Sequence, residues 1–259
     1  MTQSKRRLFL IQALLKERPE LRSLQIPRDT PAQKHLLQGL MNVRAPKKCS
    51  AEVLRIQDEY LTAELFAKGI TDVNSLSPVS KGIYLWQGDI TTLRCDAIVN
   101  AASSGMTGCY IPNHRCINNA IHTYAGMELR LACAEIMQMQ GHNELIGEAQ
   151  ITSAYNLPCK YILHTTGPVI MEKPLQEDQE LLAKCYHSCL SLAAEKQLES
   201  IAFCCISTGE FHFPNELAAK IAVCTVRNFL KQGSSVKKVI FTVPKKRDKE
   251  IYEQLLGIV

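Results

Sequence analysis

Short β-rich runs alternate with stretches of helical periodicity from Lys81 to the end of the chain. The runs are GIYLWQGDI, CDAIVNA, EAQITSAYNL, YILHTTG, SIAFCCIST and VKKVIFTVP. Two parallel strands can be joined only by a long crossover, which is usually a helix that covers one face of the sheet. SIAFCCIST is almost continuously apolar, which is typical of a strand buried on both faces. The pattern therefore predicts an α/β layered domain with a largely parallel central sheet.

Between these runs, the spacing of apolar residues predicts helices. One helix is expected to run through NNAIHTYAGMELRLACAEIMQMQG, a second from residue 178 to 197, a third from 215 to 232, and a last one at the C-terminus. In such folds, ligands bind outside the carboxyl ends of the strands. The loops after AIVN and after FCCIS are therefore the places where we expect a binding site.

Residues 1–80 have a different pattern, which is helical and contains no convincing strand. Four apolar residues recur at helical spacing: Leu8, Ile11, Leu14 and Leu15. Thr30 followed by a proline predicts a helix start. Ser50 is expected to cap another helix, and Gly69 lies just beyond its end. The polar, turn-rich TDVNSLSPVSKG then marks a boundary, which predicts an N-terminal helical extension at 1–80 and a second domain at 81–259.

Composition excludes some classes of protein. No apolar run approaches the ~18–20 residues of a membrane span. The 11 cysteines are odd in number and mostly lie in apolar segments, which favours a reducing compartment such as the cytoplasm over a disulfide scaffold. The net charge of +5 suits an anionic ligand but is too small and dispersed to indicate nucleic acid. The basic KKVIFTVPKKRDKE also contains acidic residues, so we interpret it as a solvated surface rather than a nucleic-acid site.

The segment GCYIPNHRC is the strongest candidate for a metal site. It contains Cys109, His114 and Cys116, and thiolate and imidazole are the ligands that zinc prefers. Three local ligands leave a coordination position open, as in a catalytic or substrate-binding zinc site. The alternative is a loop with one buried cysteine and a surface histidine, because spacing alone does not exclude chance clustering.

The segment STGEFHFPN, from Ser207 to Asn215, links the buried strand to a helix. Ser, Thr and Gly at such a junction let backbone N–H groups converge on an anion, and the helix N-terminus adds positive potential. A diphosphate cradle is one interpretation, and a plain turn is the other.

Two further polar residues follow predicted strands. Asp89 in QGDIT is placed to accept a hydrogen bond from a purine amine, or else to bond its own backbone in a turn. Asn100 in CDAIVNAAS can bond a sugar hydroxyl, or else cap a loop. His122 and His164 lie in apolar surroundings and are interpreted as core histidines with satisfied hydrogen bonds rather than ligands.

Taken together, GDITTLRCDAIVNAA, AIHTYAG, ILHTTGP and ISTGEFHFP resemble the macrodomain family of ADP-ribose-binding α/β modules, in the family's order. GCYIPNHRCINNAIH stands where other macrodomains carry a run of glycines, and it resembles the zinc-containing microbial branch. So do GLMNVRAP and IQDEYL in the N-terminal extension. The resemblance implies a three-layer fold with a mixed, largely parallel sheet flanked by helices.

The resemblance also implies a set of roles. Asp89 would bind the adenine amine, Ile90 would contact the ADP-ribose, and Asn100 would lie near the distal ribose. One Zn²⁺ would be bound beside that ribose by Cys109, His114 and Cys116. The diphosphate would be bound by Ser207, Thr208, Gly209, Glu210, Phe211 and His212. The branch removes mono-ADP-ribose from proteins, and is often paired with a sirtuin-like transferase and a lipoyl-carrier protein.

Two departures from the family pattern bear on catalysis. Ser103 replaces the second Asn of NAAN, and Asn118 replaces the Asp of CIDNAIH. An amide cannot act as a general base. The resemblance implies a zinc-dependent protein mono-ADP-ribosyl hydrolase, with Asn100, Ser103 and Asn118 as the catalytic candidates. The alternative is an ADP-ribose-binding module with weak or no hydrolysis.

Overall fold

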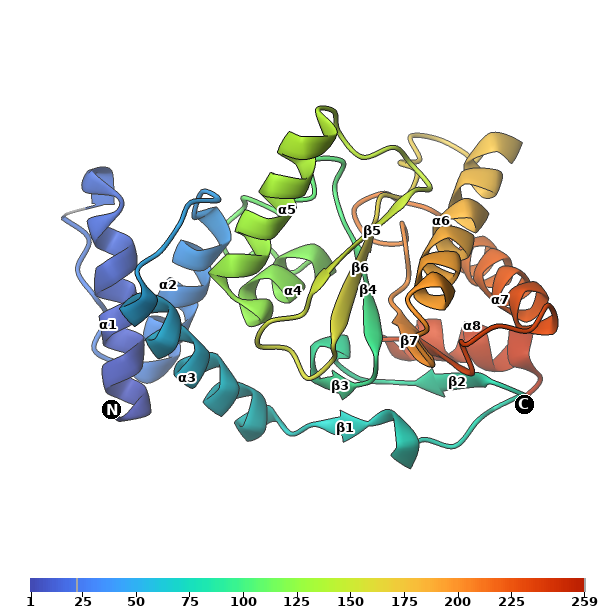
Figure 1. Ribbon diagram of the computed structural model, residues 1–259, viewed down its shortest axis with the longest axis horizontal. Helices are drawn as coiled ribbons and strands as arrows, with labels where there is room; N and C mark the ends of the chain where they lie inside the picture. Colours follow the sequence, from blue (N-terminus) through green and yellow to red (C-terminus); the bar gives the residue numbers. More distant parts are fainter. Residues whose placement is uncertain (22, 259) are drawn as a thin grey trace.

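A six-stranded sheet between two layers of helices forms the centre of the protein (Figure 1), in a computed structural model that describes residues 1–21 and 23–258. The strand order is β2-β8-β7-β4-β6-β5. The bounds are Ile83–Trp86 for β2, Ala97–Ala101 for β4, Ala149–Ser153 for β5, Tyr161–Thr165 for β6, Ser200–Phe203 for β7 and Lys238–Thr242 for β8.

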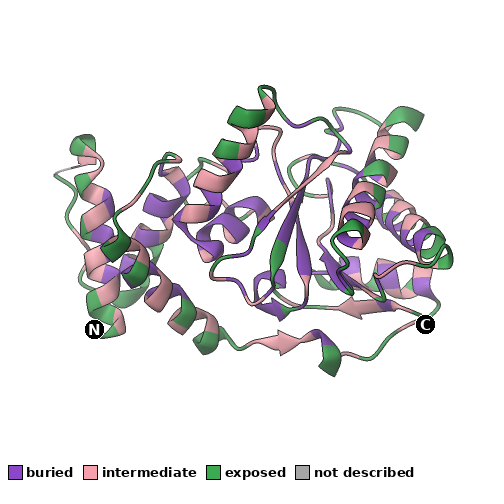
Figure 2. Ribbon diagram, in the orientation of Figure 1, coloured by how far each residue is buried: buried purple, intermediate pink, exposed green. Residues whose placement is uncertain are grey.

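All neighbouring strands of this sheet are parallel except β5, which runs antiparallel to β6 at one edge. This confirms the predicted mixed, largely parallel sheet. The central strands are buried on both faces (Figure 2), as expected for strands covered by crossover helices. The run SIAFCCIST is apolar beyond its strand, since β7 ends at Phe203 and a loop begins there.

Alternate residues of β4 separate the two layers of the core. Ala97 and Val99 pack with α6, α7 and α8, whereas Ile98 packs with α4 and α5, because successive side chains of a strand point to opposite faces. The helices span Ile117–Ala125 in α4, Met127–Gln140 in α5, Gln176–Glu195 in α6, Asn215–Lys231 in α7 and Lys246–Leu256 in α8.

The single helix predicted through residues 118–141 is wrong, because the chain breaks into α4 and α5 at Gly126. Gly126 has φ of +105°, outside the helical region. A Cβ here would lie 2.7 Å from the Gln57 amide nitrogen. The break therefore follows from the close approach of the N-terminal helices, which the local periodicity does not report.

Three helices precede the sheet and share a separate hydrophobic cluster that also includes Met127 of α5. They are α1 (Gln3–Lys16), α2 (Thr30–Val43) and α3 (Ala51–Lys68). Ser50 caps α3 and Gly69 ends it, as predicted. The predicted cap at Thr30 is wrong: the Asp29 carboxylate accepts from the Ala32 N–H at 2.8 Å, so Asp29 is the N-cap and Thr30 begins the helix.

The prediction that residues 1–80 contain no strand is also wrong. The two-residue strand β1 (Thr71–Asp72) pairs in parallel with β3 (Leu93–Arg94). Two residues are too few to show a period, so this pairing depends on a partner later in the chain. The domain boundary after residue 80 stays a prediction. Among the described residues, no helix combines the length and apolar character that a bilayer crossing needs.

Candidate functional site

Two long loops emerge from neighbouring strands at the carboxyl edge of the sheet. Residues 102–116, the metal loop, follow β4, and residues 204–214, the phosphate loop, follow β7. β4 and β7 are hydrogen-bonded neighbours. Parallel strands end at the same edge, so the two loops start side by side, where ligands of α/β sheets bind.

The three predicted metal ligands come together in the metal loop. The donor atoms of Cys109, His114 and Cys116 all lie within 4.8 Å of one another. Cys109 Sγ is 3.4 Å from His114 Nδ1. No other His, Cys, Asp or Glu of the described chain joins this group. Two sulfur donors and one imidazole fit zinc, and three protein ligands match a site with an open position.

Cys116 also begins helix α4. Its Sγ accepts from the Asn119 N–H at 3.4 Å, so the side chain serves as the N-cap. Burial, with a further contribution from Cys109, raises the pKa of the Cys116 thiol above its usual value. A bound cation reverses this effect, because a thiol that coordinates a metal is deprotonated. The cluster is therefore a better site for a cation than for two free thiolates.

Asn119 and Asn42 hold the metal loop in place. The Asn119 amide donates to the carbonyls of Ile111 and His114, both at 3.1 Å. Asn42 of α2 accepts from the Asn113 N–H at 2.9 Å. Asn113 has a positive φ of 56°, which side chains other than glycine adopt at a cost. The N-terminal helices thus stabilise a strained turn inside the metal loop.

Arg130 of α5 links the end of α2 to the metal loop. It donates to the carbonyls of Asn42 and Arg44, at 2.6 and 2.8 Å. The guanidinium carbon lies 4.4 Å from the ring centroid of Tyr110, which is a cation–π contact. The metal loop is therefore anchored to α2, α4 and α5 at once.

Asn100 lies at the end of β4 and is fully buried. Its amide nitrogen is 3.0 Å from Asn118 Oδ1 and 3.1 Å from His164 Nδ1. His164 is the direct partner of Asn100 across the β4–β6 ladder. An amide nitrogen is a donor only, so Nδ1 accepts and the proton of His164 is on Nε2, which is 2.9 Å from Thr152 Oγ1.

This network leaves one strong acceptor unused. Asn100 Oδ1 is buried and has no hydrogen-bond partner among the described residues. A buried polar atom without a partner is costly, and such atoms are enriched where a ligand supplies the missing bond. The geometry therefore leaves Asn100 Oδ1 available to a hydroxyl group, and its contact with the distal ribose stays a prediction.

The two core histidines differ. Both ring nitrogens of His164 have hydrogen-bond partners, as predicted. Neither ring nitrogen of His122 has a hydrogen-bond partner in the described chain, so the prediction is wrong for His122. Donor atoms of His122, Cys133 and His164 also lie within 4.8 Å of one another. Both ring nitrogens of His164 already take part in the hydrogen-bonded network, so we do not assign a metal to this second cluster.

Burial has a clear effect on both rings. It lowers the pKa of His164 to about 3, and it holds the pKa of His122 well below its ordinary value, with a smaller effect of His164 on His122. In the unfolded chain a histidine titrates near ~6.5. Between these values the unfolded state takes up protons that the native state excludes, so the stability present above pH ~6.5 is lost as the pH falls.

Acidification is accordingly expected to destabilise the protein before its carboxylates titrate. Each pH unit below ~6.5 costs about 1.4 kcal/mol for each such histidine. Urea unfolding at pH 7 and pH 5 measures the effect. His164→Gln should flatten the slope, whereas His142→Gln at an exposed position should not. Equal free energies of unfolding at the two pH values would contradict the expectation.

The phosphate loop presents consecutive free backbone donors. The N–H groups of Gly209, Glu210 and Phe211 donate no backbone hydrogen bond within the described chain, whereas His212 N bonds back to the Gly209 carbonyl at 3.0 Å. Ser207 has φ of +63° and a buried Oγ without a partner. Such a curved run of N–H groups, followed by the start of a helix, is suited to an anion.

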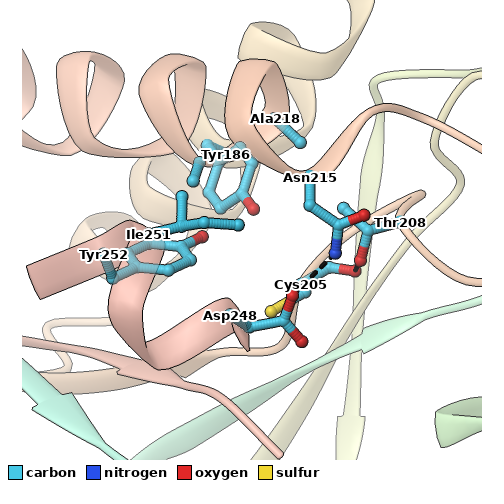
Figure 3. Close-up of a pocket in the computed structure, with 9 residues that line it drawn as sticks. Tyr186, Cys205, Thr208, Asn215, Ala218, Asp248, Ile251 and Tyr252 are labelled. Atoms are coloured by element: carbon cyan, nitrogen blue, oxygen red, sulfur yellow. Dashed lines mark hydrogen bonds between the residues drawn. The ribbon is translucent and has the colours of Figure 1, made fainter. Parts of the chain in front are cut away.

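The rear of this loop is fixed by the helices behind it. The Thr208 hydroxyl donates to the Cys205 carbonyl at 3.0 Å, and the Asn215 amide donates to Asp248 at 2.6 Å. Figure 3 shows both bonds beside the aromatic rings of Tyr186 and Tyr252, which line a small pocket with them. This pocket lies behind the loop, so we interpret it as support for the loop rather than as the ligand site.

Asp89 has two structural contacts. Its Oδ1 accepts from the N–H and the hydroxyl of Thr91, at 3.0 and 2.6 Å, as in a turn. Its Oδ2 is 3.4 Å from Lys68 Nζ at the end of α3. The neighbouring Ile90 is buried in the core. The turn interpretation therefore holds for Oδ1. The contact of Asp89 with adenine, and that of Ile90 with ADP-ribose, stay predictions.

Comparison with known proteins points to one family for this chain. The profile of the Macro domain matches residues 99–222. A Treponema medium protein named "Protein-ADP-ribose hydrolase" is 54% identical over 261 residues, covering 99% of this chain and 100% of the relative. The chain belongs to the macrodomain family. A Staphylococcus aureus relative of this macrodomain, with the same name, is 48% identical over 248 residues, covering 95% and 93% of the two chains.

Solved structures of macrodomains are also similar to this chain in fold and sequence. A mutant of the Oceanobacillus iheyensis macrodomain with ADPR is 36% identical, with a TM-score of 0.64, and covers 71% of this macrodomain and 96% of its own chain. The Trypanosoma brucei macrodomain in complex with ADP-ribose is 28% identical, with a TM-score of 0.66, over 89% and 97% of the two chains.

Sequence reasoning missed several supporting residues of this macrodomain. Asn42, Asn119 and Arg130 hold the metal loop, and His164 sets the orientation of Asn100. The string GLMNVRAP pointed to the right segment for Asn42 but not to a role. Ser103 is half-buried, and its only hydrogen bond within the described chain is from the Met106 N–H to its carbonyl. Its catalytic role stays a prediction.

Proposed function

We propose that this macrodomain is a zinc-dependent protein mono-ADP-ribosyl hydrolase. The observation that carries the proposal is the convergence of the donor atoms of Cys109, His114 and Cys116, in a loop that contacts the phosphate loop through His114 and Glu210. The next residues of the chain begin α4, where Asn118 accepts from the Asn100 amide. Relatives named protein-ADP-ribose hydrolase, similar along nearly the whole chain, support it. So do related macrodomains with ADP-ribose bound.

Each part of the site has a role in binding the substrate. Residues 207–212 wrap the diphosphate, and the free backbone N–H groups of Gly209, Glu210 and Phe211 donate to it. Asp89 binds the adenine, and Ile90 contacts the ADP-ribose. Asn100 Oδ1 accepts a hydrogen bond from the distal ribose, since its amide nitrogen is already used by Asn118 and His164. Binding energy from the ADP part thus positions the ribose and its linkage at the metal loop.

Zinc, when bound, would supply a Lewis acid for a ribose oxygen or lower the pKa of a water towards ~7. Cys109, His114 and Cys116 would bind it, and Asn42, Asn119 and Arg130 keep the loop that carries them in shape. Asn118 cannot accept a proton from water as a carboxylate would. It instead orients the Asn100 amide, at 3.0 Å.

A second function is favoured by the same Asn118. Without a carboxylate at this position, the protein would bind ADP-ribose and release it unhydrolysed, as a reader module. Calorimetry with free ADP-ribose separates the two: tight binding without turnover favours the reader, and no binding contradicts both.

The partner we propose is a protein that carries mono-ADP-ribose, such as a lipoyl-carrier protein modified by a sirtuin-like transferase. Cysteines bind zinc as thiolates, so the site needs a reducing compartment. The described cysteines are all free thiols, which supports the cytoplasm as the place of action.

The test is the release of ADP-ribose from an auto-ADP-ribosylated protein, with and without a chelator. We expect release by the zinc-loaded protein, and at least about 100-fold slower release after chelation, because the Lewis-acid chemistry that zinc would supply is then lost. Zinc restored after chelation should recover the rate, whereas magnesium should not, because it prefers oxygen ligands. Equal rates with and without chelator would contradict zinc dependence, and no release in either would contradict hydrolysis.

A further inference from the structure

We propose that Glu210 of the phosphate loop positions the metal ligand His114, and that it couples metal binding to diphosphate binding. The inference rests on the zinc site of the proposed function. It assigns Glu210 a role towards the metal, whereas the sequence placed it only among the diphosphate-binding residues. The observation behind it is the approach of Glu210 Oε1 to His114 Nε2, at 3.4 Å.

The two ring nitrogens of His114 face different groups. Nδ1 lies 3.4 Å from Cys109 Sγ, inside the donor cluster, whereas Nε2 is turned towards Glu210. A neutral imidazole carries one proton, and the nitrogen without it is the ligand. A carboxylate beside Nε2 keeps the proton there, which leaves the Nδ1 lone pair free for the metal.

Carboxylates commonly act in this way at metal sites. A ligating histidine usually donates its other N–H to a carboxylate or carbonyl, which fixes its tautomer and orientation and makes it a stronger ligand. The side chain of Glu210 is 69% exposed, against 26% for His114. Glu210 is thus not a core residue, and in the described chain the metal ligand His114 is the basic side chain that lies within 4.0 Å of its carboxylate.

The position of Glu210 is otherwise unfavourable for the proposed substrate. It lies between Gly209 and Phe211, whose N–H groups are free to bind a diphosphate, and a carboxylate repels a diphosphate. Orienting the charge towards a metal-bound His114 reduces that repulsion. A bound metal therefore favours the loop conformation that accepts the anion.

Coupling of this kind is reciprocal: if zinc strengthens ADP-ribose binding, ADP-ribose strengthens zinc binding by the same factor. The contact joins two loops from neighbouring strands, so its loss should uncouple the two affinities without affecting the core. This separates a positioning role from a merely structural one.

The test measures zinc affinity by competition with a chelator, on purified full-length protein, with and without saturating ADP-ribose. We expect Glu210→Ala to weaken zinc binding about 10–100-fold, and Glu210→Gln to weaken it less, because an amide oxygen still accepts from Nε2. Both variants should also lose the gain in zinc affinity that ADP-ribose gives the wild type. Glu172→Gln is the control, since it removes one exposed charge and leaves His114 untouched.

The outcomes are distinct. Wild-type zinc affinity in Glu210→Ala overturns the inference while the proposed function stands. An equal loss in Glu172→Gln also overturns it, because general charge would then explain the effect. A wild-type protein that binds no zinc contradicts the metal site itself, and the inference with it. Unfolding curves of the zinc-free variants should match the wild type, because Glu210 is exposed.

Discussion

Cys116→Ser is expected to abolish zinc binding and to slow ADP-ribose release at least about 100-fold, without destabilising the metal-free protein. Zinc prefers thiolate, and a neutral serine hydroxyl is a poor substitute. The folding effect is separate because Cys116 is the N-cap of α4, with Sγ accepting from the Asn119 N–H. Serine is among the preferred N-cap residues, so the helix should keep or improve its cap.

Metal analysis of the purified protein measures the first part, with one equivalent of zinc expected in the wild type and none in the variant. Urea unfolding of both zinc-free proteins measures the second. Cys224→Ser is the matched control, because Cys224 is exposed on α7 and outside the donor cluster. Full zinc content in Cys116→Ser would show that this cysteine is not a ligand. A large loss of stability in the metal-free variant would contradict the capping argument.

Asn118→Asp is expected to raise the rate constant of hydrolysis, by up to about 100-fold, because general base catalysis contributes 10²–10⁴-fold where a carboxylate is well placed. Asn118 is 6% exposed, and its Oδ1 accepts from the Asn100 amide at 3.0 Å. A carboxylate is of the same size and keeps that hydrogen bond. The substitution therefore adds a base without changing the orientation of Asn100.

Steady-state kinetics measure the effect, which should appear in kcat with little change in KM. The pH–rate profile should gain an acid limb from the new carboxyl group. Asn118→Ala should lower kcat by freeing the Asn100 amide, and Asn228→Asp, at an exposed position of α7, should change nothing. Adding Ser103→Asn removes the other departure from the family pattern. If kcat is unchanged both in Asn118→Asp and in the double variant with Ser103→Asn, these two positions have no role in catalysis.

The large elements of the fold were predictable because buried strands and helix ends require particular residues at neighbouring positions of the sequence. β7 is buried on both faces and begins an apolar run, and α3 has both a capping serine and a terminal glycine. The errors lie where a distant contact decides the local structure. Gly126 divides α4 from α5 where Gln57 approaches it, and β1 exists only because β3 pairs with it.

In the candidate site, too, local patterns were predictable and distant contacts were not. Cys109, His114 and Cys116 are close in sequence, so a short loop brings their donor atoms together. Asn42 and Asn113 are 71 residues apart, and no periodicity connects them. His122 resembled any other core histidine, and only its coordinates show both ring nitrogens without a partner in the described chain.

The amino-acid sequence alone determined the six strands of the central sheet, the three metal-ligand candidates and the macrodomain family, since these depend on local periodicity and on short motifs. Only the tertiary structure decided which groups face each other across the carboxyl edge of the sheet. Glu210 meets His114, and Asn100 meets both Asn118 and His164. Such contacts arise from the packing of strands and helices far apart in the chain, where the favourable free energy of burial sets positions that no local pattern records.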